Sequence, residues 1–174
     1  MKLLISEKEI ETKVKQLAEE ISSDYTGKTP ILIGVLNGSF IFMADLVREL
    51  SIDCEVDFIK LHSYTGTRSG GTVHLLKDIS ADITERDVII VEDIVDTGLT
   101  MKFFKERLEG AHPSSLSIVT LLFKKEVAQL NFNIDYIGFE IPSDYVVGYG
   151  LDYNQKKRNL KGIYVFNQDD GGNK

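Results

Sequence analysis

The sequence has little of several features, and each scarcity excludes a class of protein. It contains one cysteine, Cys54. A single cysteine forms neither an internal disulfide nor a zinc cluster, which fits a reducing compartment. No stretch approaches the roughly 18 consecutive apolar residues of a membrane span, and the N-terminal residues lack the apolar region of a signal peptide. We therefore expect a cytoplasmic protein that has no membrane partner.

Basic residues are outnumbered as well. The 174 residues include 20 Lys and Arg against 27 Asp and Glu, which gives a formal charge of −7. Such a balance argues against a broad basic face, so we expect no nucleic-acid partner. Hydrophobic residues make up 43% of the chain, as in globular proteins rather than disordered ones. We see no internal repeat or linker, and this length suits a single domain over residues 1–174.

Segments of helical periodicity alternate with apolar runs that predict strands. Ser6 and Glu9 form a capping box before a helix whose apolar positions recur on one face up to Ile21. Residues 40–50 and 100–108 predict two more helices. Strands are predicted at residues 31–36, 53–64, 73–79, 88–91, 116–123, 136–141 and 163–166. This alternation is typical of an α/β fold with a mainly parallel central sheet flanked by helices, which binds ligands at the carboxyl ends of its strands.

Two of these strands, residues 53–64 and 73–79, predict a long hairpin. Its tip at residues 65–72 is rich in glycine and too polar to pack. We expect this long hairpin loop to be flexible, and it is either a plain loop or a lid over a site.

The stretch from Val88 to Thr100 is the most specific part of the chain. An apolar run ends there in carboxylates, a glycine and two threonines, and a helix follows. The first N–H groups of a helix suit an anion, and Gly98 lets the backbone approach it closely. Because Glu92 and Asp93 would repel a bare phosphate, the ligand should carry hydroxyls or a divalent cation beside its phosphate, as a ribose 5-phosphate does. The alternative is an acidic strand end before a well-capped helix.

The nine residues Glu92 to Thr100 resemble the phosphoribosyl-pyrophosphate motif of the type I phosphoribosyltransferases, in the form found in their hypoxanthine-guanine branch. Residues 63–64, 138–142 and 146–154 resemble the same family, in the right order and at comparable spacing. The likeness runs from about Ile31 to Phe166. It implies the type I phosphoribosyltransferase fold, with a small hood formed by the terminal segments.

The resemblance also implies a purine-salvage reaction. A nitrogen of hypoxanthine or guanine attacks the anomeric carbon of phosphoribosyl pyrophosphate, which releases pyrophosphate and gives IMP or GMP. The resemblance implies Mg²⁺ as cofactor and a homodimer or homotetramer. One alternative is the same chemistry on xanthine or uracil. Another is a regulator that senses phosphoribosyl pyrophosphate and binds RNA or DNA, against which the acidic charge argues.

Each residue that matches the family carries an implied role. The acid–base group facing the purine N7 is Asp96, for which the alternative is a helix N-cap. Residues expected to bind the ribose and its phosphate are Glu92, Asp93, Asp96, Thr97, Gly98, Leu99 and Thr100. Pyrophosphate is assigned to Asn37, Gly38 and Arg158, and the flexible loop opens at Ser63 and Tyr64. The purine is assigned to Lys124, Tyr145, Val146 and Asp152, and the metal to Glu92, Asp93 and Asp152.

Some of these matches have a plain alternative or a departure from the family. Lys124, which would donate to a 6-oxo group, could instead belong to a solvated strand end, Tyr145 to the core, and Arg158 to an exposed basic run. Asn37 and Leu99 stand where many relatives carry lysine. The bond before Asn37 matches a family site with a cis peptide.

Overall fold

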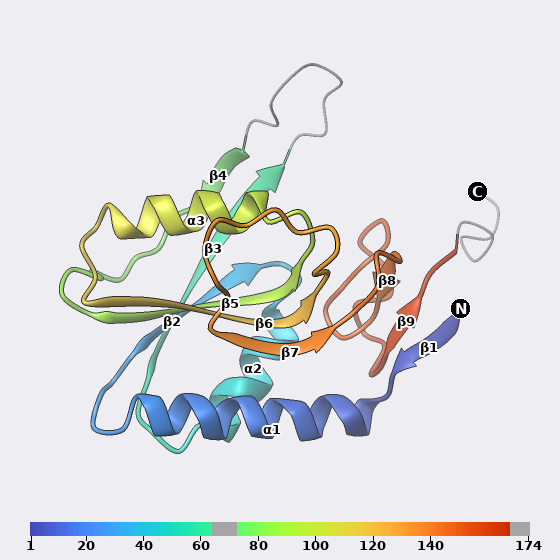
Figure 1. The fold of residues 1–174 in the computed structure, drawn as a ribbon, viewed down its shortest axis with the longest axis horizontal. Helices are drawn as coiled ribbons and strands as arrows, with labels where there is room; N and C mark the ends of the chain where they lie inside the picture. Colours follow the sequence, from blue (N-terminus) through green and yellow to red (C-terminus); the bar gives the residue numbers. More distant parts are fainter. Residues whose placement is uncertain (64–72, 168–174) are drawn as a thin grey trace.

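The computed structural model describes residues 1–63 and 73–167, which form two sheets and three helices (Figure 1). In chain order the elements are β1 (Lys2–Ile5), α1 (Glu7–Asp24), β2 (Ile31–Leu36), α2 (Phe40–Glu49), β3 (Glu55–Ser63), β4 (Val73–Lys77), β5 (Asp87–Val95), α3 (Leu99–Glu109), β6 (Ser115–Phe123), β7 (Tyr136–Glu140), β8 (Val146–Val147) and β9 (Ile163–Val165).

The larger sheet has six strands in the order β4-β3-β2-β5-β6-β7. All neighbours are parallel except β3 and β4, which form the predicted antiparallel hairpin. This confirms the mainly parallel central sheet. The tip of the hairpin, including Tyr64 and the expected lid, lies outside the described residues.

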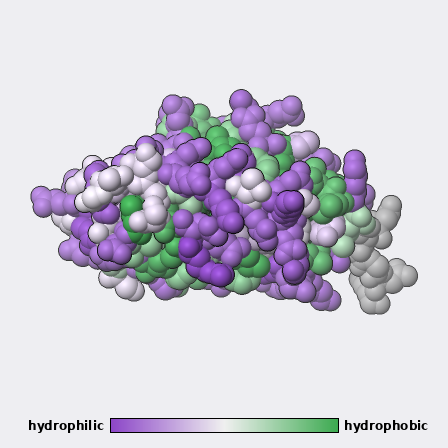
Figure 2. All heavy atoms as spheres, turned by 90° about the horizontal axis from the view of Figure 1, so that it is seen from below, coloured by the Kyte–Doolittle hydropathy of each residue, from purple (hydrophilic) through white to green (hydrophobic). Residues whose placement is uncertain are grey.

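Helices cover both faces of this sheet. Figure 1 shows α1 and α2 on one side and α3 on the other, and each side has its own hydrophobic cluster. The capping box predicted for α1 is present, since the Glu9 amide donates to Ser6 Oγ and the Ser6 amide donates to Glu9 Oε2. Figure 2 shows that the face seen from the side of α1 is largely hydrophilic. In the described residues, no helix is long and apolar enough to cross a membrane.

The smaller sheet joins the two ends of the chain in the order β1-β9-β8. The strands at residues 2–5 and 146–147 were not predicted from the sequence. Both are short, and β1 is paired only with β9, at the far end of the chain. The segment between β8 and β9 leaves this sheet and reaches the carboxyl ends of the central strands.

The central strand β5 continues farther than the apolar run predicted. It extends to Val95, so Glu92 and Asp93 are strand residues rather than loop residues. Both are buried, at 5% and 8% exposure. The Leu36–Asn37 peptide bond is cis, as in the family site that it resembles.

Candidate active site

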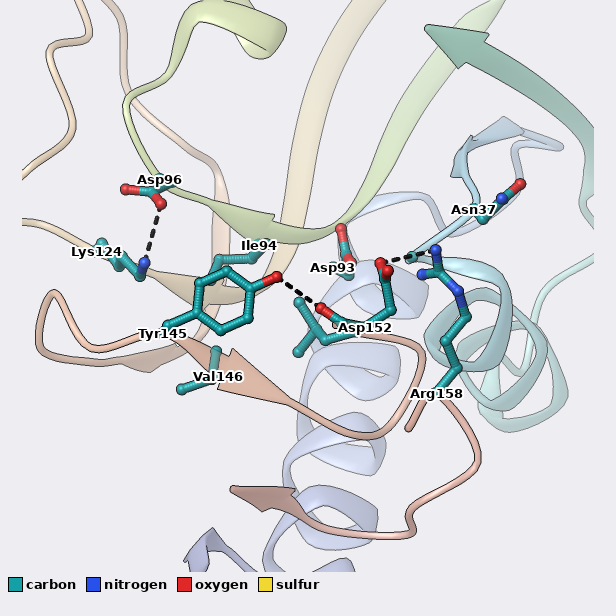
Figure 3. A pocket seen from close by; sticks show the side chains of 11 residues that line it. Asn37, Asp93, Ile94, Asp96, Lys124, Tyr145, Val146, Asp152 and Arg158 are labelled. Carbon is teal, nitrogen blue, oxygen red and sulfur yellow. Dashed lines mark hydrogen bonds and ion pairs between the residues drawn. The ribbon is translucent and has the colours of Figure 1, made fainter. Parts of the chain in front are cut away.

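A pocket of about 290 Å³ opens at the carboxyl ends of the central strands (Figure 3). Loops after β2, β5 and β6 form one part of its wall, and the segment from Tyr145 onward forms the other. The residues that line it are Asn37, Gly38, Asp93, Ile94, Asp96, Lys124, Tyr145, Val146, Leu151, Asp152 and Arg158.

An ion pair between Lys124 and Asp96 occupies one end of the pocket. The Lys124 Nζ donates to Asp96 Oδ2 at 2.9 Å. The lysine side chain is 7% exposed and the aspartate side chain 50% exposed, so the ammonium is fixed while the carboxylate faces the opening. Lys124 is therefore not part of a solvated strand end. The neighbouring Lys125 points outward and pairs with Glu140.

Tyr145 stands beside this ion pair. The residue is 54% exposed, and its ring contacts the rings of Tyr153 and Phe166. Its hydroxyl donates to the Asp152 carbonyl oxygen at 2.7 Å, which fixes one edge of the ring. Tyr145 therefore presents an aromatic surface to the pocket (Figure 3) and is not a core tyrosine.

The other end of the pocket carries Arg158 and Asp152. Arg158 Nη2 lies 2.7 Å from Asp152 Oδ1, and its Nη1 donates to the Gly150 carbonyl at 2.7 Å. The backbone amide of Gln155 donates to the second carboxylate oxygen of Asp152. Figure 3 shows the guanidinium on the same side of the pocket as Asn37. This arginine is thus held in place rather than lying in an exposed basic run.

Two adjacent carboxyls are buried between the two ends, of which Asp93 lines the pocket floor and Glu92 does not. Burial raises the pKa of Glu92 well above its usual value, and the neighbouring Asp93 adds to this effect. Burial also raises the pKa of Asp93, although hydrogen bonds and the charge of Arg158 oppose the rise. Gly38 packs directly on Asp93, because a Cβ atom at this glycine would lie 1.7 Å from Asp93 Oδ2.

The predicted phosphate loop follows Asp96 at the start of α3. Gly98 is the N-cap with a φ of +87°, and no side chain caps the helix. Asp96 is therefore not the N-cap, and the well-capped helix considered above is wrong. The first amides of α3 have no partner within the helix, and the Leu99 amide makes only a long hydrogen bond of 3.5 Å to Thr97 Oγ1 in the preceding loop. A loop with open amides suits an anion.

The structure brings most of the predicted site residues to one edge of the sheet, but not all of them line the pocket. Those outside its lining are Ser63, Glu92, Thr97, Gly98, Leu99 and Thr100. Glu92 lies under the floor, and the residues after Asp96 form the adjoining loop. Ile94 and Leu151 line the pocket and were not predicted. The only signal for either was an apolar side chain next to a predicted site residue.

The three carboxylates predicted to bind metal do not form one cluster. Among the described residues, no group of three or more His, Cys, Asp or Glu side chains could hold a metal ion. Asp152 is instead paired with Arg158.

Known proteins resemble this chain over nearly its whole length. A family model described as a phosphoribosyl transferase domain matches residues 4–154. The hypoxanthine-guanine phosphoribosyltransferase of Streptococcus mutans is 41% identical over 169 residues, which are 97% of this chain and 94% of the relative. The protein of the same name from Aquifex aeolicus is 44% identical, over 95% of this chain and 94% of its own length. A crystal structure of a hypoxanthine-guanine phosphoribosyltransferase from Bacillus anthracis matches with a TM-score of 0.92 at 43% identity, covering 96% of this chain and 99% of that one.

Proposed function

We propose, because the chain belongs to the phosphoribosyl transferase domain family, that its pocket transfers the phosphoribosyl group of phosphoribosyl pyrophosphate to hypoxanthine or guanine. The products are IMP or GMP and pyrophosphate, as in purine salvage. The observation that carries the proposal is the division of one pocket into two ends. A buried lysine and an aromatic ring lie at one end, and a fixed arginine and a glycine loop lie at the other.

The first end suits an oxopurine. Tyr145 offers its face for stacking, and Ile94 and Val146 add apolar surface. Lys124 is a fixed donor for a 6-oxo group, because its ammonium is buried and keeps hydrogen atoms beyond the one given to Asp96. Asp96 faces the opening beside it and serves as the proton acceptor or donor for the purine N7.

The second end suits a pyrophosphate group. Arg158 supplies a planar set of donors, and Asn37 and Gly38 line the same pocket, where a glycine leaves room for the backbone to approach a ligand. The open amides of α3 at Gly98 suit the 5-phosphate. The ribose hydroxyls then lie between these groups, over Asp93.

Magnesium fits the charges of the pocket. Its described lining holds three carboxylates, Asp93, Asp96 and Asp152, against two cations, Lys124 and Arg158. Even if Asp93 is protonated the lining is only neutral, so a polyanionic substrate needs further positive charge. Of the carboxylates predicted to bind the ion, Asp93 and Asp152 line the pocket and Glu92 does not, so we assign the ion to Asp93, with Asp152 at the pyrophosphate end and Glu92 behind Asp93. Mg²⁺ commonly takes one or two carboxylates and completes its shell with phosphate oxygens and water, and when bound it would neutralise the leaving pyrophosphate.

The reaction test uses separate bases. The protein is mixed with phosphoribosyl pyrophosphate and Mg²⁺, and hypoxanthine, guanine, xanthine, adenine and uracil are offered one at a time. We expect nucleotide from hypoxanthine or guanine. Product from xanthine or uracil alone would favour the alternative base, and no product from any base would overturn the enzymatic function.

We propose in addition that the sheet β1-β9-β8 is the hood of a single domain, and that the protein acts in the cytoplasm as a homodimer or homotetramer. Sedimentation of the purified protein measures the oligomeric state directly.

A further inference from the structure

The loop between β8 and β9 contains a short segment that packs against the Gly38 loop. Gly148, Tyr149 and Gly150 have φ values of +103°, +50° and +98°, and this left-handed region is uncommon for a bulky residue such as tyrosine. A Cβ atom at Gly150 would lie 2.1 Å from the carbonyl oxygen of Gly38. The segment therefore rests directly on the loop assigned to pyrophosphate.

The Tyr149 side chain attaches this segment to α2. Tyr149 is 7% exposed, and its hydroxyl donates to Asp45 Oδ2 at 2.6 Å. Asp45 lies in α2, which begins at Phe40, directly after the Gly38 loop. One hydrogen bond thus joins the β8–β9 loop to the helix that carries the other side of the pyrophosphate end.

The backbone of the same segment holds Arg158. The Tyr149 amide donates to the Leu160 carbonyl at 2.8 Å, and the Gly150 amide donates to the Arg158 carbonyl at 3.0 Å. Arg158 Nη1 donates back to the Gly150 carbonyl. Tyr149 is not part of the described pocket lining, so any influence of its side chain on the pocket has to pass through Gly150 and Arg158.

We propose that Tyr149 is a positioning residue for pyrophosphate recognition, and that its hydrogen bond to Asp45 holds the segment Gly148–Gly150 and Arg158 against Gly38. This inference rests on the proposed function and adds to it a residue outside the pocket. The bond is linked through Gly150 to Arg158 and Gly38, which line the pyrophosphate end, so its loss should weaken binding of pyrophosphate groups and leave binding of the base unchanged.

The test compares two tyrosine variants that lose the same kind of bond. Tyr149→Phe removes the hydroxyl that donates to Asp45. Tyr136→Phe removes a hydroxyl that donates to Asp24 Oδ2 at 2.7 Å. Tyr136 is also 7% exposed, and neither Tyr136 nor Asp24 lines the pocket. The two variants should therefore lose similar amounts of thermal stability.

Only Tyr149→Phe should affect the pyrophosphate end. We expect its KM for phosphoribosyl pyrophosphate, and its Kd for pyrophosphate with Mg²⁺ by calorimetry, to rise about tenfold. Its kcat and its KM for hypoxanthine should stay within about twofold of wild type. Tyr136→Phe should leave all four values unchanged. Equal KM values for phosphoribosyl pyrophosphate in the two variants would overturn the proposal, as would a common change of kcat and both KM values in Tyr149→Phe.

A conservative variant separates the hydrogen bond from the charge of Asp45. Asp45→Asn keeps a side-chain oxygen that accepts from Tyr149, so we expect nearly wild-type affinity for pyrophosphate. A loss as large as in Tyr149→Phe would refute the role of the hydrogen bond. These outcomes can be told apart from failure of the proposed function. If that function is wrong, the wild-type protein forms no nucleotide, and calorimetry with pyrophosphate can still compare the variants.

Discussion

Substitution of Gly38 by alanine places a steric clash directly in the proposed site. The new Cβ atom would lie 1.7 Å from Asp93 Oδ2 and 2.5 Å from Asp93 Cγ, whereas ordinary contacts of a Cβ atom are 3.4 Å or longer. Asp93 is 8% exposed and belongs to the central strand β5. Next to Asp93 the backbone of β5 is paired with β6, at Glu92 and at Ile94, so we expect the Asp93 side chain to move rather than the strand.

The cost of this movement should appear as lost substrate binding. The open space next to the Asp93 carboxyl is the pocket that it lines, so rotation carries the carboxyl into the volume that the substrate needs. Overpacking of a filled site costs about 1–3 kcal/mol. At about 1.4 kcal/mol per factor of ten, kcat/KM for phosphoribosyl pyrophosphate should fall roughly 5- to 150-fold.

Steady-state kinetics measure whether the strain weakens substrate binding, and thermal unfolding measures whether it lowers the stability of the fold. Gly110→Ala is the matched control, because a Cβ atom at Gly110 meets nothing closer than 3.5 Å and the backbone there is already right-handed helical. We expect the control to keep wild-type kinetics. If Gly38→Ala binds phosphoribosyl pyrophosphate as tightly as wild type, the close packing of Gly38 on Asp93 does not shape the site.

Three further variants test separate parts of the molecule. Asp96→Asn should keep binding of phosphoribosyl pyrophosphate by calorimetry but lower turnover at least about tenfold, and wild-type turnover would remove Asp96 from the mechanism. Ser6→Ala removes the cap of α1 and should cost about 1 kcal/mol, a fall in Tm of about 2–4 °C, with unchanged kinetics. Burial raises the pKa of Asp57, but hydrogen bonds from backbone amides, mainly that of Ala81, outweigh it and lower this pKa below its usual 3.8. Asp57 therefore adds stability at pH values above about 4 that is lost as the pH falls further, and Asp57→Asn should show a weaker acid-side loss in urea unfolding.

The sequence predicts best those elements whose signal is local. The capping box at Ser6 and Glu9 marks the start of α1 because both partners lie within one turn. The unbroken apolar residues of β5 predict a strand buried on both faces, and this strand lies in the middle of the sheet. The strand β1 has no comparable signal, because it is four residues long and its partner β9 lies at the other end of the chain.

The side chains of β5 show why part of the pocket could not be predicted. Val88 and Ile90 pack in the cluster under α3, so strict alternation along the strand would send Ile94 to the same side. Ile94 instead packs against the cluster under α1 and α2, and Val95 packs under α3. The alternation therefore changes phase after Val91. This change turns Ile94 toward the pocket. No residue type between Val91 and Ile94 predicts such a change of alternation.

The ion pair between Lys124 and Asp96 connects the choice of base with the acid–base group, although 28 residues separate them in the chain. An ammonium has three donors, so Lys124 can keep Asp96 and also donate to the oxygen of a 6-oxopurine. Adenine would place an amino group there, which is a donor and cannot accept a hydrogen bond from Lys124. Leaving these buried donors unpaired would cost about 1–3 kcal/mol of binding free energy. Because Lys124 is buried and Asp96 is half exposed, the lysine cannot turn away and the aspartate stays beside it. A base that satisfies Lys124 is therefore held next to Asp96, the carboxylate that we propose exchanges a proton with it.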